Sequence, residues 1–150
     1  MGTVITIDPG VKASGVALWS AEGTLIEGSY RTIQEVKLLL SELLKPSLLI
    51  CEFPRIYPKA AQHKGDLNDL LNLSAVVGYI EGLFCCVEPR RIYPSEWKGQ
   101  VPKVIMTERI KKALTPLELA RVKSVGSKTH NVLDAVGIGL HHFRRLHGRR

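Results

Sequence analysis

The sequence predicts one α/β domain over residues 1–150, built around a mixed β-sheet. Three β-rich segments separated by short turns lie within residues 1–30, which is typical of an antiparallel meander. An amphipathic helix and then a short, continuous apolar segment follow, an order that favours a buried strand parallel to an earlier one. With 150 residues and 45% apolar content, the chain can bury one sizeable core but not two.

The three meander strands are bounded by turn residues. The first strand covers residues 4–8 and ends at the Asp8-Pro9-Gly10 turn. Residues 14–20 form the second strand, and a Glu22-Gly23 turn separates it from the third strand at residues 24–30. Asp8 is therefore expected at the end of the first strand.

A helix and a buried strand follow the meander. Thr32-x-x-Glu35 is a capping-box pattern that begins the helix, and Pro46 ends it. Residues 47–51 are continuously apolar, which favours a central strand of the sheet. Glu52 is therefore expected at the C-terminal end of that strand.

The next helix carries a stripe of small residues. A polar, proline-containing connection at residues 53–65 leads into a helix predicted at residues 66–84. Ser74, Gly78 and Gly82 recur at intervals of four residues along it. Glycine destabilises a helix interior by roughly 1 kcal/mol relative to alanine, so another helix is expected to pack closely there. That helix belongs either to the same chain or to a second copy.

The remaining elements complete the sheet and add helices. Residues 85–93 are predicted as the fifth strand and residues 94–99 as a loop. A helix covers residues 103–114, and a short helix begins after Thr115, which is followed by Pro116. The final helix is predicted at residues 129–146, with one apolar face towards the core.

Basic residues are concentrated in the C-terminal part of the chain. Lys and Arg total 21 against 14 Asp and Glu, a net charge of +7 with His neutral. Residues 1–89 carry a net charge of −3 and residues 90–150 a net charge of +10. Such a surface favours a nucleic-acid partner, bound through its phosphates, over a merely solvated basic face.

Cysteine usage and hydropathy exclude several protein classes. Cys51, Cys85 and Cys86 match neither a disulfide framework nor a zinc-ligand spacing, which favours reduced thiols. The longest apolar runs are far shorter than the roughly 18 residues that span a bilayer, and no secretory signal pattern begins the sequence. We therefore expect a cytoplasmic protein without a membrane partner.

Three acidic residues occupy positions that stability alone does not explain. Asp8 and Glu52 end two apolar strands, and Asp134 lies among apolar residues of the last helix. If the two strands are parallel neighbours, the first two acids emerge side by side, and the helix can bring the third to them. Three such carboxylates repel one another unless a hard divalent cation, Mg²⁺ or Mn²⁺, neutralises them. Each acid alone has an ordinary explanation as a turn, surface or helical residue, but the joint pattern favours a metal site.

Three motifs also resemble a known family. They are Ile5-Thr6-Ile7-Asp8-Pro9-Gly10 with Gly15-Val16-Ala17, then Cys51-Glu52-Phe53-Pro54, and then the segment from His130-Asn131 through Asp134 to Leu140. Their order and spacing resemble the RuvC family of Holliday junction resolvases, within the RNase H-like superfamily, over nearly the whole chain. The second and third motifs are more similar to a phage-encoded branch of this family than to the cellular enzyme.

The resemblance implies a fold, an activity and partners. The fold is RNase H-like, with a five-stranded mixed sheet of three antiparallel strands and then parallel strands, flanked by helices. The activity is paired nicking of a four-way DNA junction by a homodimer, with hydrolysis supported by two Mg²⁺ ions per site for which Mn²⁺ would substitute. Asp8, Glu52 and Asp134 would hold the ions, and no organic small-molecule cofactor is expected.

The fourth residue of the site has two candidates. Family members carry Asp or His three residues before the last Asp, where this chain has Asn131, while His130 lies one residue earlier on the same helix face. Asn131 matches the position but its amide is a poor base, whereas His130 can bind a metal or assist a water molecule. We favour His130. A polar residue at the helix N-terminus without a catalytic role is the alternative.

Other residues are expected to shape the DNA path. Aromatic side chains after Glu52 would stack on bases near the opened crossover, and basic side chains would contact phosphates. Trp97 also fits the role of a core anchor. The predicted DNA-binding residues are Phe53, Arg55, Tyr57, Lys59, Lys64, Trp97, Lys98, Lys103 and Lys128.

Two other functions fit parts of the same sequence. A YqgF-like nuclease that processes RNA shares the small fold and the opening Asp-x-Gly turn, although the motifs at Glu52 and at His130 argue against it. A non-catalytic protein that binds branched DNA would keep the acids for stability alone.

Overall fold

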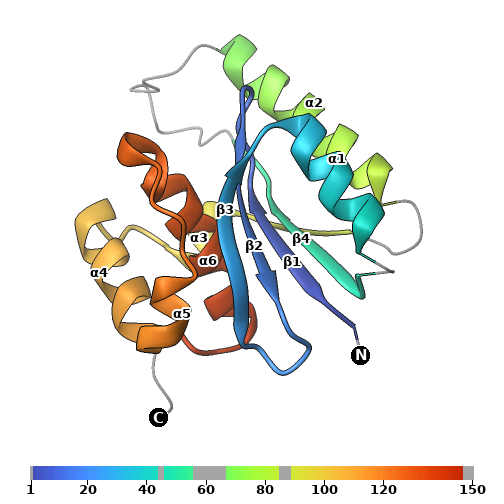
Figure 1. The fold of residues 1–150 in the computed structure, drawn as a ribbon. Coiled ribbons are helices and arrows are strands. Elements are labelled where there is room, and N and C mark those ends of the chain that lie inside the picture. Colours follow the sequence, from blue (N-terminus) through green and yellow to red (C-terminus); the bar gives the residue numbers. More distant parts are fainter. Residues whose placement is uncertain (1, 44–45, 56–66, 85–88, 147–150) are drawn as a thin grey trace.

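The computed structural model describes residues 2–43, 46–55, 67–84 and 89–146 (Figure 1). Its strands are β1 (Val4–Asp8), β2 (Ser14–Trp19), β3 (Leu25–Arg31), β4 (Leu48–Glu52) and β5 (Arg90–Ile92). Its α-helices are α1 (Ile33–Glu42), α2 (Leu67–Leu83), α3 (Pro94–Trp97), α4 (Lys103–Ala113), α5 (Pro116–Ala120) and α6 (Thr129–His142). A 3₁₀ turn, η1 (Gly126–Lys128), leads directly into α6.

The five strands form one mixed sheet in the order β3-β2-β1-β4-β5. The first three strands are antiparallel neighbours, while β4 pairs in parallel with both β1 and β5. This arrangement confirms the predicted meander and the predicted parallel central strand.

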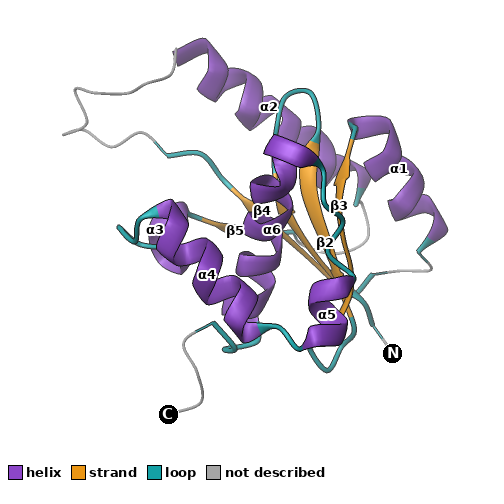
Figure 2. Ribbon diagram, turned by 60° about the vertical axis from the view of Figure 1, so that its left-hand side comes forward, coloured by secondary structure: helices purple, strands orange, loops and turns teal. Residues whose placement is uncertain are grey.

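Helices cover both faces of the sheet (Figures 1 and 2). One face packs against α1 and α2, and residues that alternate along the central strands, such as Ile7 and Cys51, point into that layer. On the other face α6 crosses β1, β2 and β3, with α3 and α4 packed against it. Val4 and Ile50 point into this second layer. The pleat therefore decides which strand residues face α6.

The capping patterns were located correctly, but one predicted loop is a helix. Thr32 and Glu35 form the predicted capping box of α1, and Thr115 begins α5 in the same way. Residues 94–99, predicted as a loop, contain α3 instead. Pro94 is pre-organised for the first helical turn, and the Glu96 carboxylate accepts a hydrogen bond of 2.6 Å from the Tyr93 backbone N–H.

Two boundaries differ from the sequence prediction. The fifth strand is only three residues long, and residues 85–88 of its predicted range lie outside the described part of the chain. The final helix ends at His142 rather than at residue 146. Arg144 has a φ of 57°, a left-handed conformation that stops the helix.

Cys51 is buried in the sheet, where burial raises its pKa well above the usual value for a thiol. Cys85 and Cys86 lie outside the described residues. Within the described ranges, none of the helices is long and apolar enough to span a lipid bilayer.

Candidate active site

Two of the three acids end neighbouring parallel strands. Ile7 of β1 pairs with Cys51 of β4, so Asp8 and Glu52 follow at the same level of the sheet. Ile7 and Cys51 point towards α1 and α2, so the next residue of each strand points towards α6. Both carboxylates therefore emerge on the face that α6 covers, at one end of the sheet.

The third acid reaches them because α6 lies close to β2. Gly15, the strand partner of Asp8, has no side chain, and a Cβ there would lie 1.9 Å from the Asn131 carbonyl oxygen. The glycine thus allows the first turn of α6 to rest directly on the strand beside Asp8. Asp134 then lies one turn further along α6 and lines the same groove as Asp8.

The three carboxylates are electrostatically coupled. Burial raises the pKa of Asp8 well above its usual value, and the nearby charges of Glu52 and Asp134 raise it further. Lys98 and Lys103 act in the opposite direction and lower the pKa of Asp8. Carboxylates that share a site in this way need an added positive charge to be ionised together.

Lys98 supplies one such charge. Its Nζ lies 3.4 Å from Glu52 Oε2 and 3.6 Å from Asp134 Oδ2, so it bridges two of the three acids. Burial lowers the pKa of Lys98, but Glu52, Asp134 and Asp8 together raise it above the usual value for lysine. Lys98, which the sequence predicts to contact DNA, therefore lies within the acidic cluster itself.

Trp97 is not an exposed DNA-binding aromatic. Only 1% of its surface is exposed, because its ring packs in the core against α4 and α6. Its indole Nε1 donates a hydrogen bond of 2.6 Å to Glu52 Oε2. A buried tryptophan of this kind cannot stack on a base without repacking the core, so the alternative prediction of a core anchor is correct.

The donor set suits a hard divalent cation. Three carboxylates offer the oxygen ligands that Mg²⁺ and Mn²⁺ prefer. Burial first, and then the charges of Glu52 and Asp134, raise the pKa of Asp8. Among the described residues, no group of three Asp, Glu, His or Cys side chains is arranged closely enough to hold a metal ion. Lys98 lies between Glu52 and Asp134 in this arrangement.

Both candidates for the fourth site residue line the groove that contains Asp8 and Asp134. His130 Nδ1 lies 2.7 Å from the Ser127 carbonyl oxygen. A carbonyl can only accept, so Nδ1 carries a proton, and in the neutral imidazole the Nε2 lone pair is left for a ligand or a water molecule. Asn131 lies at the junction of this groove with a second groove on the other side of Asp8.

The two grooves flank Asp8 and are lined by lysines. The first, of about 480 Å³, contains Lys98 and Lys103, both predicted from the sequence. The second, of about 350 Å³, contains Lys128, also predicted, and Lys12, which the sequence analysis missed. The position of Lys12, two residues after the Asp8-Pro9-Gly10 turn, is the signal that would have identified it.

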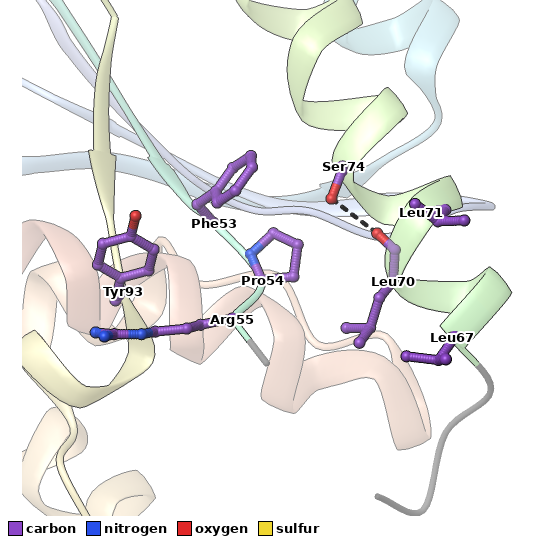
Figure 3. Close-up of a pocket in the computed structure, with 8 residues that line it drawn as sticks. All are labelled: Phe53, Pro54, Arg55, Leu67, Leu70, Leu71, Ser74 and Tyr93. Carbon is purple, nitrogen blue, oxygen red and sulfur yellow. Dashed lines mark hydrogen bonds between the residues drawn. The ribbon is translucent and has the colours of Figure 1, made fainter. Parts of the chain in front are cut away.

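The other predicted DNA-binding residues lie after β4. Phe53 and Arg55 line an apolar hollow of about 490 Å³ between the end of β4 and the start of α2 (Figure 3). The Arg91 guanidinium lies 4.4 Å from the centre of the Phe53 ring, and that of Arg55 lies 5.2 Å from the centre of the Tyr93 ring. Tyr57, Lys59 and Lys64 lie outside the described residues.

Comparisons with known proteins find likeness in fold only. No protein-family model matches the chain, and no curated protein sequence does. Among solved structures, Thermus thermophilus RuvC in complex with a Holliday junction substrate superposes with a TM-score of 0.64 at 17% identity, over 96% of this chain and 94% of that one. The fowlpox virus Holliday junction resolvase superposes with a TM-score of 0.59 at 14% identity, over 95% and 98% of the two chains.

A third structure, the fowlpox virus resolvase with its substrate Holliday junction DNA, gives a TM-score of 0.57 at 17% identity, over 97% of this chain and 99% of that one. These likenesses span nearly the whole chain. They confirm the predicted RNase H-like fold, in the form that the RuvC resolvase has.

Proposed function

We propose that this protein is a nuclease that cuts four-way DNA junctions, as the resemblance of its motifs implies. The observation that carries the proposal is that Asp8 and Glu52 end neighbouring parallel strands and that Asp134 lines the same groove as Asp8, with Lys98 paired to Glu52 and Asp134. Structural similarity to two junction resolvases supports the same reaction class. The whole chain, residues 1–150, would act as one nuclease domain.

The three carboxylates would hold Mg²⁺, with two ions in each site and Mn²⁺ able to substitute. Bound ions would supply an activated water molecule and charge stabilisation for the leaving 3′-oxygen, so the products would carry 5′-phosphate and 3′-hydroxyl ends. Asp8 is the central ligand in this proposal because the negative charges of Glu52 and Asp134 both raise its pKa.

Lys98 and His130 would assist in different ways. Lys98 holds Glu52 and Asp134 together before substrate arrives. Once metal ions neutralise these acids, the Lys98 ammonium would pair with a phosphate oxygen of the DNA. His130 keeps its Nε2 lone pair available because Nδ1 donates to Ser127. This lone pair would bind an ion or orient the attacking water molecule.

The grooves define a path for the cut strand. A phosphodiester chain that crosses Asp8 would contact Lys98 and Lys103 on one side and Lys12 and Lys128 on the other. The hollow beside Phe53 would accept an unpaired base from the opened crossover, because its lining is almost entirely apolar (Figure 3).

We also propose that two copies pair through α2, which would place two active sites on one symmetric junction. A Cβ on Gly78 or Gly82 would have no atom within 4 Å apart from those of α2 itself, so no other helix of the described residues packs closely there. On the same helix, Tyr79 is 51% exposed and is not part of the hollow beside Phe53. The exposed face is therefore both apolar and open to close approach.

The dimer has a simple test. A Cβ at Gly78 or Gly82 meets no atom of the described residues outside α2 within 4 Å, so replacement of both by Gln should be accommodated and should improve helix propensity. Sedimentation analysis should report a monomer with an unchanged or raised melting temperature. An unchanged dimer mass would place the interface elsewhere, and a monomeric wild type would contradict the homodimer.

The function is tested with a labelled synthetic four-way junction and a linear duplex of matched sequence, in Mg²⁺ or in EDTA. We expect symmetric, Mg²⁺-dependent nicks at the junction only, and their loss in Asp8→Asn with binding retained. Tight junction binding without cleavage by the wild type would favour the non-catalytic DNA-binding protein. If the wild type neither binds nor cuts the junction, the same assay should be repeated with structured RNA, the substrate expected of a YqgF-like nuclease. A junction-cutting enzyme would act in the cytoplasm of a bacterial or phage-infected cell, where such DNA forms.

A further inference from the structure

Trp97 holds the Glu52 carboxylate from inside the core. The indole N–H and the Lys98 ammonium both contact the same oxygen, Oε2, at 2.6 Å and 3.4 Å. These are the contacts that the described residues make with this carboxylate, so Oε1 is the oxygen left for another ligand. The two donors differ in charge, because an indole is neutral and an ammonium is not.

The indole is itself held firmly. It sits at the end of α3, which Pro94 and Glu96 fix at its first turn. A Cβ on Gly137 of α6 would lie 2.4 Å from the ring, so helix and indole are in direct contact. Ile110 of α4 belongs to the same buried cluster. The packing of α3, α4 and α6 around the ring therefore fixes the position of the Trp97 N–H donor.

We propose that Trp97 is a positioning residue, whose indole N–H fixes Glu52 Oε2 and so presents Oε1 to the metal ion. This inference rests on the proposed function, because it gives Glu52 the role of a metal ligand. A neutral donor can stay in place when a cation arrives, whereas Lys98 repels one and must shift. Removing a donor that hydrogen-bonds to a metal ligand typically changes metal affinity or activity by 10–100-fold.

Trp19 provides a matched control. It is fully buried like Trp97, but its indole Nε1 donates a bond of 3.0 Å to Thr6 Oγ1, a hydroxyl that donates in turn to the Ala135 carbonyl oxygen and not to a carboxylate. Trp97→Phe and Trp19→Phe each remove one buried indole donor. We expect Mg²⁺ affinity, measured by calorimetry without DNA, to fall about 10-fold or more in Trp97→Phe. It should stay within about twofold in Trp19→Phe, even where the melting temperature falls equally, because no ligand is released there.

A second measurement leaves Trp97 in place. The chain has two tryptophans, so Trp19→Phe makes Trp97 the only indole fluorophore. Lys98 Nζ lies 4.7 Å from the centre of its ring, and its displacement by Mg²⁺ should change the Trp97 emission. Glu52→Gln in the same background should abolish that change.

Three outcomes would overturn the inference. They are equal Mg²⁺ affinity in Trp97→Phe and wild type, equal losses in both tryptophan variants, or Mg²⁺ binding that leaves Trp97 emission unchanged. A wild type that binds no Mg²⁺, with or without junction DNA, would instead overturn the metal-dependent function, and the role of Trp97 with it. The wild-type titration thus separates the two failures.

Discussion

Buried acids at the two ends of the sheet differ in how fully they are paired. At the end opposite Asp8, Glu118 of α5 is 3% exposed and fully paired. Arg145 donates to both of its carboxylate oxygens, at 2.6 Å and 2.7 Å, and the Leu25 backbone N–H donates at 2.9 Å. These bonds, that of Arg145 foremost, lower the pKa of Glu118 to about 2.

At the Asp8 end, Lys98 pairs with two of the three acids, and burial with like charge raises the pKa of Asp8. Glu118 stabilises the fold because each of its oxygens has a donor. In the acid cluster the like charges repel one another, and a bound cation can reduce that repulsion. A buried acid with complete pairing is structural, and a group of incompletely paired acids marks a site.

The largest expected effect separates activity from stability at Asp8. Asp8→Asn should lower cleavage at least about 10³-fold, since several kcal/mol of transition-state stabilisation depend on the held ions.

In EDTA the same variant should be more stable than wild type at neutral pH. The raised pKa means that ionised Asp8 costs stability once the pH rises above about 3.8 and through the folded pKa. Melting temperatures should therefore coincide in acid and diverge as the pH rises. A destabilised Asp8→Asn at pH 7 would contradict this.

Glu118→Gln should have the opposite signature. Lowering a pKa from 4.5 to about 2 corresponds to about 3 kcal/mol of stability, and a neutral amide cannot provide it. The contribution is complete above the unfolded pKa of 4.5 and is lost as the pH falls towards about 2. Denaturant unfolding should show this difference at pH 7 and a shrinking difference in acid. Cleavage per folded molecule should remain at the wild-type level.

The two candidates for the fourth site residue should differ in size of effect. His130→Ala should lower the single-turnover cleavage rate about 10²-fold, a typical value for a group that assists proton transfer. Asn131→Ala should cost less, because its amide neither takes up a proton nor balances the acids. Junction affinity in Ca²⁺ serves as the control and should change little in either variant. A larger loss in Asn131→Ala would reverse the assignment.

The smallest effect is expected at the second lysine groove. Lys12→Ala and Lys128→Ala should each weaken junction binding a few-fold and reduce the slope of log affinity against log salt by about 1. Lys123→Ala is the matched control, because Lys123 pairs with Glu27 at 3.0 Å. Equal slopes for all three variants would exclude the groove from the DNA path.

The sequence could predict what is encoded locally. Thr32 with Glu35 and Thr115 with Glu118 begin helices because a side chain satisfies backbone donors within four residues. The acids at the ends of two apolar strands were evident because apolar runs rarely end in a charge without a reason. The α3 helix was missed because four residues give too little periodicity to distinguish a helix from a loop.

The sequence by itself determined the order of the five strands and of the longer helices, the basic segment 90–150 and the choice of three candidate acids. Only the tertiary structure decided which partners those acids have. Trp97 and Lys98 lie 45 and 46 residues from Glu52 in the chain, and Arg145 lies 27 residues from Glu118. No local pattern encodes such distances. The folded chain places Glu118 beside Arg145 and the Leu25 backbone N–H, whereas at the other end of the sheet Lys98 pairs with Glu52 and Asp134 and leaves the buried Asp8 beside like charges.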